Sequence, residues 1–226
     1  MGRKKRARPV ASRRAKAGQE EDGGAGEAGA GGSKRERNKR EKRARILAAA
    51  RSLFAEQGFD ETTGRQVCER AAVGTGTLFL YVRDKRELLL WVFEQDARRI
   101  LSRPIPTRGT PVDRWLAFLN PFLALYARDT RLARNYVREL LFRPENPPEL
   151  MQLNQALRAG LSEIAETAQA RGELRKDVGP EEMGSLVAGQ YAHLVQAWLG
   201  SGRLGARQVR ARLRRGLALL VEGLEP

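Results

Sequence analysis

The chain has 226 residues and a formal net charge of +15, with 42 Lys and Arg against 27 Asp and Glu. Hydrophobic residues make up 41% of it, enough to bury a core, and its single cysteine excludes a disulfide within the chain. No stretch approaches the roughly 18 apolar residues of a membrane-spanning helix, and no secretory signal is recognisable. These features predict a soluble cytoplasmic protein with no membrane partner.

Residues 1–33 are predicted to form a disordered tail. A basic stretch there is followed by a Gly- and Ala-rich segment with almost no large apolar side chain to bury. Basic residues are densest in the first 91 residues, as expected of a surface that binds a phosphate backbone. An arginine-rich composition that serves only solubility explains the charge equally well. Two roles fit the basic stretch, an arm in the DNA minor groove or a non-specific tether.

From Lys34 onward the pattern is helical. A first helix ends at Gly58, and Thr62 or Thr63 can cap a short second helix, with Gln66 in capping-box position after Thr63. A third helix is predicted over 75–82 and a fourth from Asp84. The first helix repeats apolar residues at helical spacing: Ile46, Ala50, Leu53 and Phe54.

Three prolines, at positions 104, 106 and 111, interrupt the chain before the C-terminal half. Five further helices are predicted over about 111–128, 130–142, 147–171, 180–201 and 205–224. No alternating apolar and polar pattern indicates a strand. The predicted fold class is all-α, with an N-terminal three-helix helix-turn-helix domain followed by a helical C-terminal domain.

The segment from Thr63 to Arg83 has the spacing of a helix-turn-helix motif. Two short helices that cross steeply need a small residue at the crossing, and Cys68 supplies it. The turn, four residues after Cys68, needs a residue that tolerates a left-handed backbone. In the second helix, Leu78 is placed to anchor the helix in the core. We interpret Cys68 as a packing residue without a redox role.

The sequence TTGRQVCERAAVGTGTLFLYVRDKRELL resembles the N-terminal domain of the TetR family of transcriptional regulators. The resemblance is dense from about Lys42 to Phe93. Composition, helix pattern and resemblance together predict four segments. They are a tail over 1–33, a helix-turn-helix domain over 34–83, a connecting helix over 84–103 and a ligand-sensing and dimerisation domain over 104–226. The matching residues are Thr62, Thr63, Val67, Val73, Gly76, Thr77, Leu78, Tyr81, Lys85 and Leu88.

Three residues depart from the family's pattern. Ala72 stands where glycine is usual, which would cost about 1–2 kcal/mol if that backbone is left-handed. Phe79 replaces the usual tyrosine and so removes a hydroxyl that often reaches a phosphate. Gly74 stands where serine often caps the recognition helix, and a cap of that kind contributes about 1 kcal/mol.

Double-stranded DNA is the predicted partner of the third helix, which would lie in the major groove. Its exposed N-terminal residues Thr75, Gly76 and Thr77 would face base edges, Leu80 would add an apolar contact, and Arg65 is the best candidate to read guanine. Phosphates are assigned to Thr63, Tyr81 and Lys85. Tyr81 is interpreted equally well as a packing residue. For Lys85 the alternative is an ordinary solvated lysine.

Helices 180–201 and 205–224 carry more apolar residues than one face needs, which predicts a homodimer through a four-helix interface. The resemblance implies the same arrangement, and a symmetric dimer suits a palindromic operator. In the alternative, these faces pack only within one chain. The residues on helix 180–201 form two sets: Met183, Leu186, Val187, Tyr191, Leu194 and Trp198; and Ala188, Ala192, Val195 and Leu199.

The C-terminal half is rich in aromatic residues, which predicts a pocket for a small apolar or amphipathic effector. The alternative is that most of these residues belong to the core. With one histidine, His193, and one cysteine, no metal site and no cofactor are expected. The proposed pocket residues are Trp115, Phe118, Phe122, Tyr126, Tyr136, Tyr191 and Trp198.

Together these features predict a sequence-specific DNA-binding regulator, a ligand-responsive homodimeric repressor of the cytoplasm, associated with the nucleoid. A regulator without a small-molecule inducer, or an activator, is the alternative. A basic interaction or membrane-surface protein is a third reading, based on Lys34–Arg45. An enzyme is not expected, because no paired nucleophile and base, metal cluster or cofactor loop is present.

Overall fold

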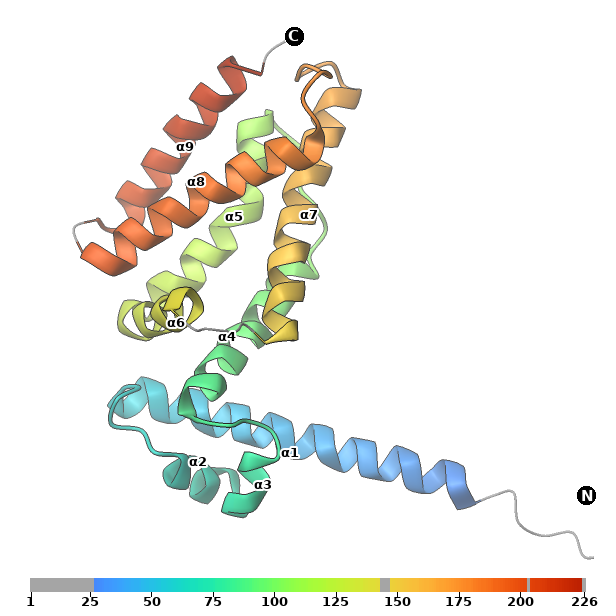
Figure 1. Cartoon of the computed structure of the whole chain (residues 1–226), viewed down its shortest axis with the longest axis vertical. Coiled ribbons are helices and arrows are strands. Elements are labelled where there is room, and N and C mark those ends of the chain that lie inside the picture. Colours follow the sequence, from blue (N-terminus) through green and yellow to red (C-terminus); the bar gives the residue numbers. More distant parts are fainter. Residues whose placement is uncertain (1–26, 143–146, 203, 225–226) are drawn as a thin grey trace, which may run out of the picture. The chain divides into compact units, whose positions relative to one another are not determined.

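The computed structural model describes residues 27–142, 147–202 and 204–224, and within them the regular structure is entirely helical (Figure 1). The predicted all-α class is therefore confirmed. The helices are α1 (Glu27–Gln57), α2 (Gly64–Ala71), α3 (Thr75–Phe79), α4 (Lys85–Leu101), α5 (Pro111–Arg128), α6 (Thr130–Phe142), α7 (Pro148–Ala170), α8 (Pro180–Ser201) and α9 (Ala206–Glu222).

The chain divides into two compact units, residues 1–39 and residues 40–226. In the first unit the described part is the beginning of α1, which starts at Glu27, inside the segment predicted to be a tail. The added residues 27–33 include two alanines but also Gly29, Gly31 and Gly32, which are poor helix formers, so local helix propensity does not account for this extension. The basic stretch expected to act as an arm or tether lies outside the described residues.

Local sequence signals set most helix ends in the second unit. Thr110 caps α5 through a capping box with Asp113, and Pro111 occupies the first turn, where its missing N–H is harmless. Asp84 caps α4 by accepting a hydrogen bond from the Glu87 amide. Helix α3 ends at Phe79, earlier than the predicted 82, because the Leu80 amide bonds to the Thr77 carbonyl and tightens the last turn.

The N-terminal part of the second unit is a small helical core around α4. Helix α1 contributes Ile46, Ala50 and Phe54, and α4 contributes Leu88 and Leu89, all of them buried. The residues that complete this core from the two short helices and the chain after them are Val67, Cys68, Ala71, Leu78 and Val82. Because these side chains occupy the inner faces of α2 and α3, the outer faces remain in solvent.

Helices α5, α7, α8 and α9 form the larger core of the C-terminal part (Figure 1). The indole N–H of Trp115 donates to the Leu161 carbonyl at 3.0 Å, which ties α5 to α7. Glycine permits the close approach of α8 to α7, since a Cβ at Gly184 would lie 2.4 Å from Ser162 Oγ and 2.9 Å from its backbone nitrogen. No helix in the described ranges has the length and apolar character that crossing a bilayer would require.

This crossing predicts that Gly184→Ala destabilises the protein. The added methyl group meets backbone atoms of α7 that cannot rotate away, so we expect a loss of about 1–3 kcal/mol in the free energy of unfolding. Denaturant unfolding followed by circular dichroism measures it. Gly189→Ala is the control on the same helix, because no atom lies within 4 Å of its added Cβ. It should stabilise by about 0.5–1 kcal/mol; equal effects of the two substitutions would contradict the packing argument.

Candidate functional site

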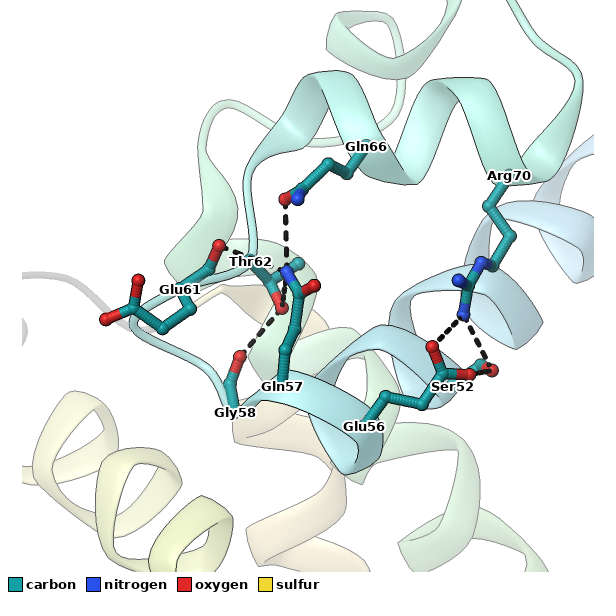
Figure 2. Close-up of polar contacts among 8 residues, drawn as sticks. All are labelled: Ser52, Glu56, Gln57, Gly58, Glu61, Thr62, Gln66 and Arg70. Carbon is teal, nitrogen blue, oxygen red and sulfur yellow. Dashed lines mark hydrogen bonds and ion pairs between the residues drawn. The ribbon is translucent and has the colours of Figure 1, made fainter.

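A polar cluster fixes α2 against the end of α1 (Figure 2). Thr62 is fully buried, and its hydroxyl donates to the Gly58 carbonyl at 2.7 Å. The Gln57 amide nitrogen donates to the Glu61 carbonyl at 3.1 Å and to the Gln66 side-chain oxygen at 3.1 Å. These bonds satisfy polar atoms of the loop that a helix end would otherwise leave unpaired. They set the direction in which α2 begins.

The other end of α2 is held by an ion pair. Arg70 donates from Nη1 to Glu56 at 2.5 Å and to Ser52 Oγ at 3.1 Å (Figure 2). The Arg70 side chain, followed by that of Ser52, lowers the pKa of the Glu56 carboxyl. Helix α2 is thus attached to α1 at both of its ends.

The turn after α2 contains the left-handed residue that the motif requires. Ala72 has φ 51° and ψ 51°, and its amide bonds to carbonyls of the last turn of α2. It is the one non-glycine residue with positive φ in the described ranges. The Val73 amide bonds to the Cys68 carbonyl at 3.0 Å, which closes the turn. The expected strain at Ala72 is therefore present.

Helix α3 presents an exposed surface formed by small and apolar residues. Thr75 and Gly76 are exposed, and Phe79 and Leu80 are 57% and 83% exposed, whereas Leu78 is buried. Gly74 stands at the N-cap and makes no side-chain cap bond, so the first-turn amides are not capped by a side chain. Sequence reasoning treated Phe79 only as a departure from the family's pattern; its exposure adds it to the candidate surface.

On α2 the structure places the two predicted DNA-binding residues differently. Thr63 forms the capping box with Gln66, whose side-chain oxygen accepts from the Thr63 amide at 2.8 Å. The Arg65 side chain is 85% exposed and donates to Glu69 at 2.9 Å. An exposed ion pair of this kind contributes little, so Arg65 can exchange Glu69 for another acceptor at low cost.

Lys85 and Tyr81 pack more closely against the domain than the sequence indicated. Lys85 Nζ donates to the carbonyls of Phe59 and Asp60, at 2.9 Å each, and lies 4.6 Å from the centre of the Phe59 ring. One of its three N–H groups is left for a further acceptor. The Tyr81 ring lies 6.0 Å from the ring of Trp91. Both roles at phosphates stay predictions.

Cys68 lies in the core of this domain and is 3% exposed. Burial raises the pKa of its thiol, which keeps it protonated at neutral pH. This placement agrees with the packing role predicted for the residue.

A cavity of about 360 Å³ lies in the C-terminal part, between α4, α5, α6, α7 and α8. Of the seven aromatic residues predicted to form a pocket, four line it: Phe122, Tyr126, Tyr136 and Tyr191. Trp115, Phe118 and Trp198 do not line it. Each is buried in the helix packing: Trp115 bonds to α7, and Phe118 occupies the space that Gly160 leaves open.

The cavity has a buried aromatic floor and an exposed rim of polar and apolar residues. Phe93 stacks on Tyr136 with ring centres 4.2 Å apart, and Tyr126 lies 6.2 Å from each of those rings. Burial raises the pKa of Tyr136 and Tyr191 well above the ordinary tyrosine value, so both hydroxyls stay protonated at neutral pH. The rim consists of exposed residues of α6, α7 and α8: Leu141, Asn154, Arg158, Ala192 and Gln196.

Helix α4 connects this cavity with the helix-turn-helix region. Near its start, Arg86 pairs with Glu139 of α6 at 3.7 Å. Toward its end, Asp96 accepts from Arg51 of α1 at 2.9 Å. Phe93 and Ala97 of the same helix line the cavity. A displacement of α4 therefore alters contacts in both parts of the molecule.

Most apolar residues that predicted a homodimer are buried within one chain. On α8, Met183, Val187 and Leu199 are at most 1% exposed, and on α9 Val209 and Leu213 are fully buried. The alternative in which these faces pack within the chain therefore accounts for most of them. Leu186 of α8 and Leu219 of α9 remain exposed, at 49% and 59%. Among the described residues, no group of three or more potential metal ligands occurs.

The chain is similar to known transcription regulators. Residues 46–92 match the family model of bacterial regulatory proteins of the tetR family. The fatty acid metabolism regulator protein of Bacillus subtilis (strain 168) is 24% identical over 165 residues, which cover 70% of this chain and 84% of that protein.

Solved structures of two FadR proteins share the fold. FadR of Thermus thermophilus, a TetR-family repressor in complex with lauroyl-CoA, is 29% identical, with a TM-score of 0.59 over 80% of this chain and 94% of that chain. FadR of Bacillus subtilis, in complex with stearoyl-CoA, is 22% identical, with a TM-score of 0.60 over 80% of this chain and 99% of that chain.

The left-handed turn predicts that Ala72→Gly stabilises the protein. Glycine adopts this backbone without the Cβ clash, and after subtraction of its larger unfolded-state entropy we expect a gain of about 0.5–1 kcal/mol. Ala48→Gly is the matched control, because Ala48 is exposed within α1 and the same change there should destabilise by a similar amount. Thermal unfolding of both variants measures the difference; effects of the same sign would contradict the assignment of strain to Ala72.

Proposed function

We propose that this chain, which belongs to the TetR family of bacterial transcription regulators, is a repressor that a fatty acyl-CoA releases from DNA. The observation that carries the proposal is the combination of an exposed α3 surface and an apolar cavity joined by one helix, α4. Cytoplasmic location beside the nucleoid follows from such a role.

The DNA-binding surface consists of the outer faces of α2 and α3. Thr75, Gly76 and Thr77 approach base edges from the first turn of α3, with Phe79 and Leu80 as apolar contacts to thymine methyl groups. Arg65 exchanges its Glu69 partner for a guanine edge. Thr63, Tyr81 and Lys85 contact phosphates at the margins, where they orient the domain without reading sequence.

A homodimer would place two α3 helices on a palindromic operator, about one turn of DNA apart. Its interface would use the outer faces of α8 and α9, where Leu186 and Leu219 leave large apolar side chains in solvent. Burial of both side chains against a second copy would favour association.

The effector would lie with its acyl chain in the cavity and its charged part at the rim. Leu140, Leu153 and Val195 give the chain an apolar wall. Arg158 lies at the rim, and its Nη1 donates to the exposed Ser185 hydroxyl at 3.3 Å. A guanidinium in this position suits the phosphates of coenzyme A. The lauroyl-CoA bound to Thermus thermophilus FadR supports this class of effector.

Release from DNA follows if the effector prefers an arrangement of α4 that DNA does not. A chain in the cavity presses on Phe93 and Ala97, and the shift of α4 reaches the recognition region through Lys85 and its carbonyl partners. Differential affinity of about 1–3 kcal/mol between the two arrangements is enough for a 5- to 150-fold change in DNA affinity.

For DNA recognition we expect Arg65→Ala to weaken binding to the selected operator by about 1–3 kcal/mol and to relax the preference at one base position per half-site. In vitro selection of bound DNA followed by fluorescence anisotropy measures both effects and the number of chains per operator. Arg108→Ala is the control, since it removes the same charge from an exposed loop residue. If Arg65→Ala and Thr77→Ala both leave the affinity unchanged, the contact assignment is wrong.

For the effector we expect dodecanoyl-CoA to lower operator affinity at least about tenfold, whereas coenzyme A alone leaves it unchanged. Arg158→Ala should weaken dodecanoyl-CoA binding while preserving operator affinity, and Arg108→Ala should change neither. Isothermal titration calorimetry and anisotropy measure the two affinities. Tight acyl-CoA binding without any change in DNA affinity would contradict the proposal that acyl-CoA releases the protein from DNA.

A further inference from the structure

The floor of the cavity carries hydroxyl groups that a plain hydrocarbon chain cannot use. Tyr126 of α5, Tyr136 of α6 and Tyr191 of α8 converge there from three helices and are each more than nine-tenths buried. Leucine or phenylalanine would fill the same space without a polar atom. Three tyrosines in the buried end of an otherwise apolar cavity therefore call for a chemical explanation.

Tyr191 is the most informative of the three. Its Oη is buried and has no hydrogen-bond partner among the described residues. Burial raises the pKa of Tyr191, and the neighbouring Tyr126 hydroxyl raises it further, both by charge and as a nearby polar group. Tyr191 Oη still makes no hydrogen bond of acceptable geometry, and a hydroxyl that can donate one bond and accept two keeps capacity for a ligand beside Tyr126. Buried hydroxyls in native proteins are paired with protein, water or ligand in the large majority of cases. Tyr191 Oη is therefore free to bond to a bound molecule.

The position of Tyr191 defines which part of that molecule it meets. The exposed rim of Asn154, Arg158 and Gln196 is where a charged head remains in solvent. Tyr191 is 6% exposed and, with Phe93, Tyr126 and Tyr136, belongs to the buried part of the cavity lining. A ligand whose head is at the rim presents its apolar body to Tyr191.

We propose that this floor selects effectors that carry a hydroxyl or oxo group on the apolar body, remote from the charged head. The inference rests on the proposed function in one respect, that the cavity holds the effector. The effector class is thereby narrowed from fatty acyl-CoA in general to oxygenated acyl-CoA, with Tyr191 Oη as the hydrogen-bonding partner. A site built to bond to an oxygen discriminates strongly against the analogue that lacks it, because its own hydroxyl is then left unpaired.

The test compares dodecanoyl-CoA with its analogues hydroxylated at carbon 8, 10 or 12 of the acyl chain, by calorimetry on the full-length protein. We expect at least one hydroxylated ligand to bind about tenfold more tightly than dodecanoyl-CoA. Tyr191→Phe should abolish that preference and leave dodecanoyl-CoA affinity unchanged or higher. Thr107→Val, which removes an exposed hydroxyl outside the cavity, should retain the preference.

Unfolding of the unliganded variant separates this role from a structural one. If Tyr191 Oη has no partner within the protein, Tyr191→Phe leaves the unfolding midpoint unchanged or raises it, whereas loss of a structural hydrogen bond lowers it. A lowered midpoint, or a wild-type protein that binds every hydroxylated analogue no more tightly than dodecanoyl-CoA, would overturn the inference and leave the proposed function standing. If no ligand of the series binds, both are overturned.

Discussion

The burial of α4 in both parts of one continuous core is the constraint on which the rest of the molecule depends. Leu88 and Leu89 near its start are buried with α1 and the short helices, while Phe93 and Ala97 further along line the cavity. Interiors are close-packed, so the helix cannot adjust to one part of this core without affecting the other. Lys85 adds a polar link, because it holds the loop between α1 and α2 by two carbonyls. A regulator needs such a shared element, since a ligand acts at a distance only by favouring one of two arrangements.

The α3 surface and the cavity differ in the kind of group that is left without a partner in the protein. At α3 the core is complete behind Leu78, and apolar groups such as Phe79 and Leu80 remain outside, where a duplex can cover them. In the cavity, hydroxyl groups remain inside, where water has little access. In both places a side chain lies in an environment that is energetically unfavourable until a partner or ligand covers it or bonds to it. Residues of this kind indicate the chemical class of the partner or ligand.

The sequence alone was sufficient to locate the helices and the motif, but not the start of α1, the end of α3 or the partners of individual side chains. Proline, glycine and polar turn signals predicted the ends of α5, α6 and α8, and the spacing of the motif predicted a residue at the turn that tolerates a left-handed backbone, which is Ala72. Periodicity shows which face of a helix is apolar but not what that face meets. For that reason periodicity could not separate Tyr126, which lines the cavity, from Trp115 in the core. Nor could it show that the apolar faces of α8 are largely buried within the chain. The attachment of Lys85 to a loop 25 residues earlier depends on tertiary structure and has no local signal.

The position of Cys68 gives the chain an internal reporter. As the only thiol in the sequence, it is enclosed between α2 and the rest of the recognition domain. An alkylating reagent reaches that sulfur only in molecules whose short helices have separated, so the labelling rate counts transient openings of this one region. The modification is read by mass as a single addition, without any introduced probe. A wild-type preparation can thereby reveal how often the packing of α2 and α3 opens, with and without an occupant in the distant cavity.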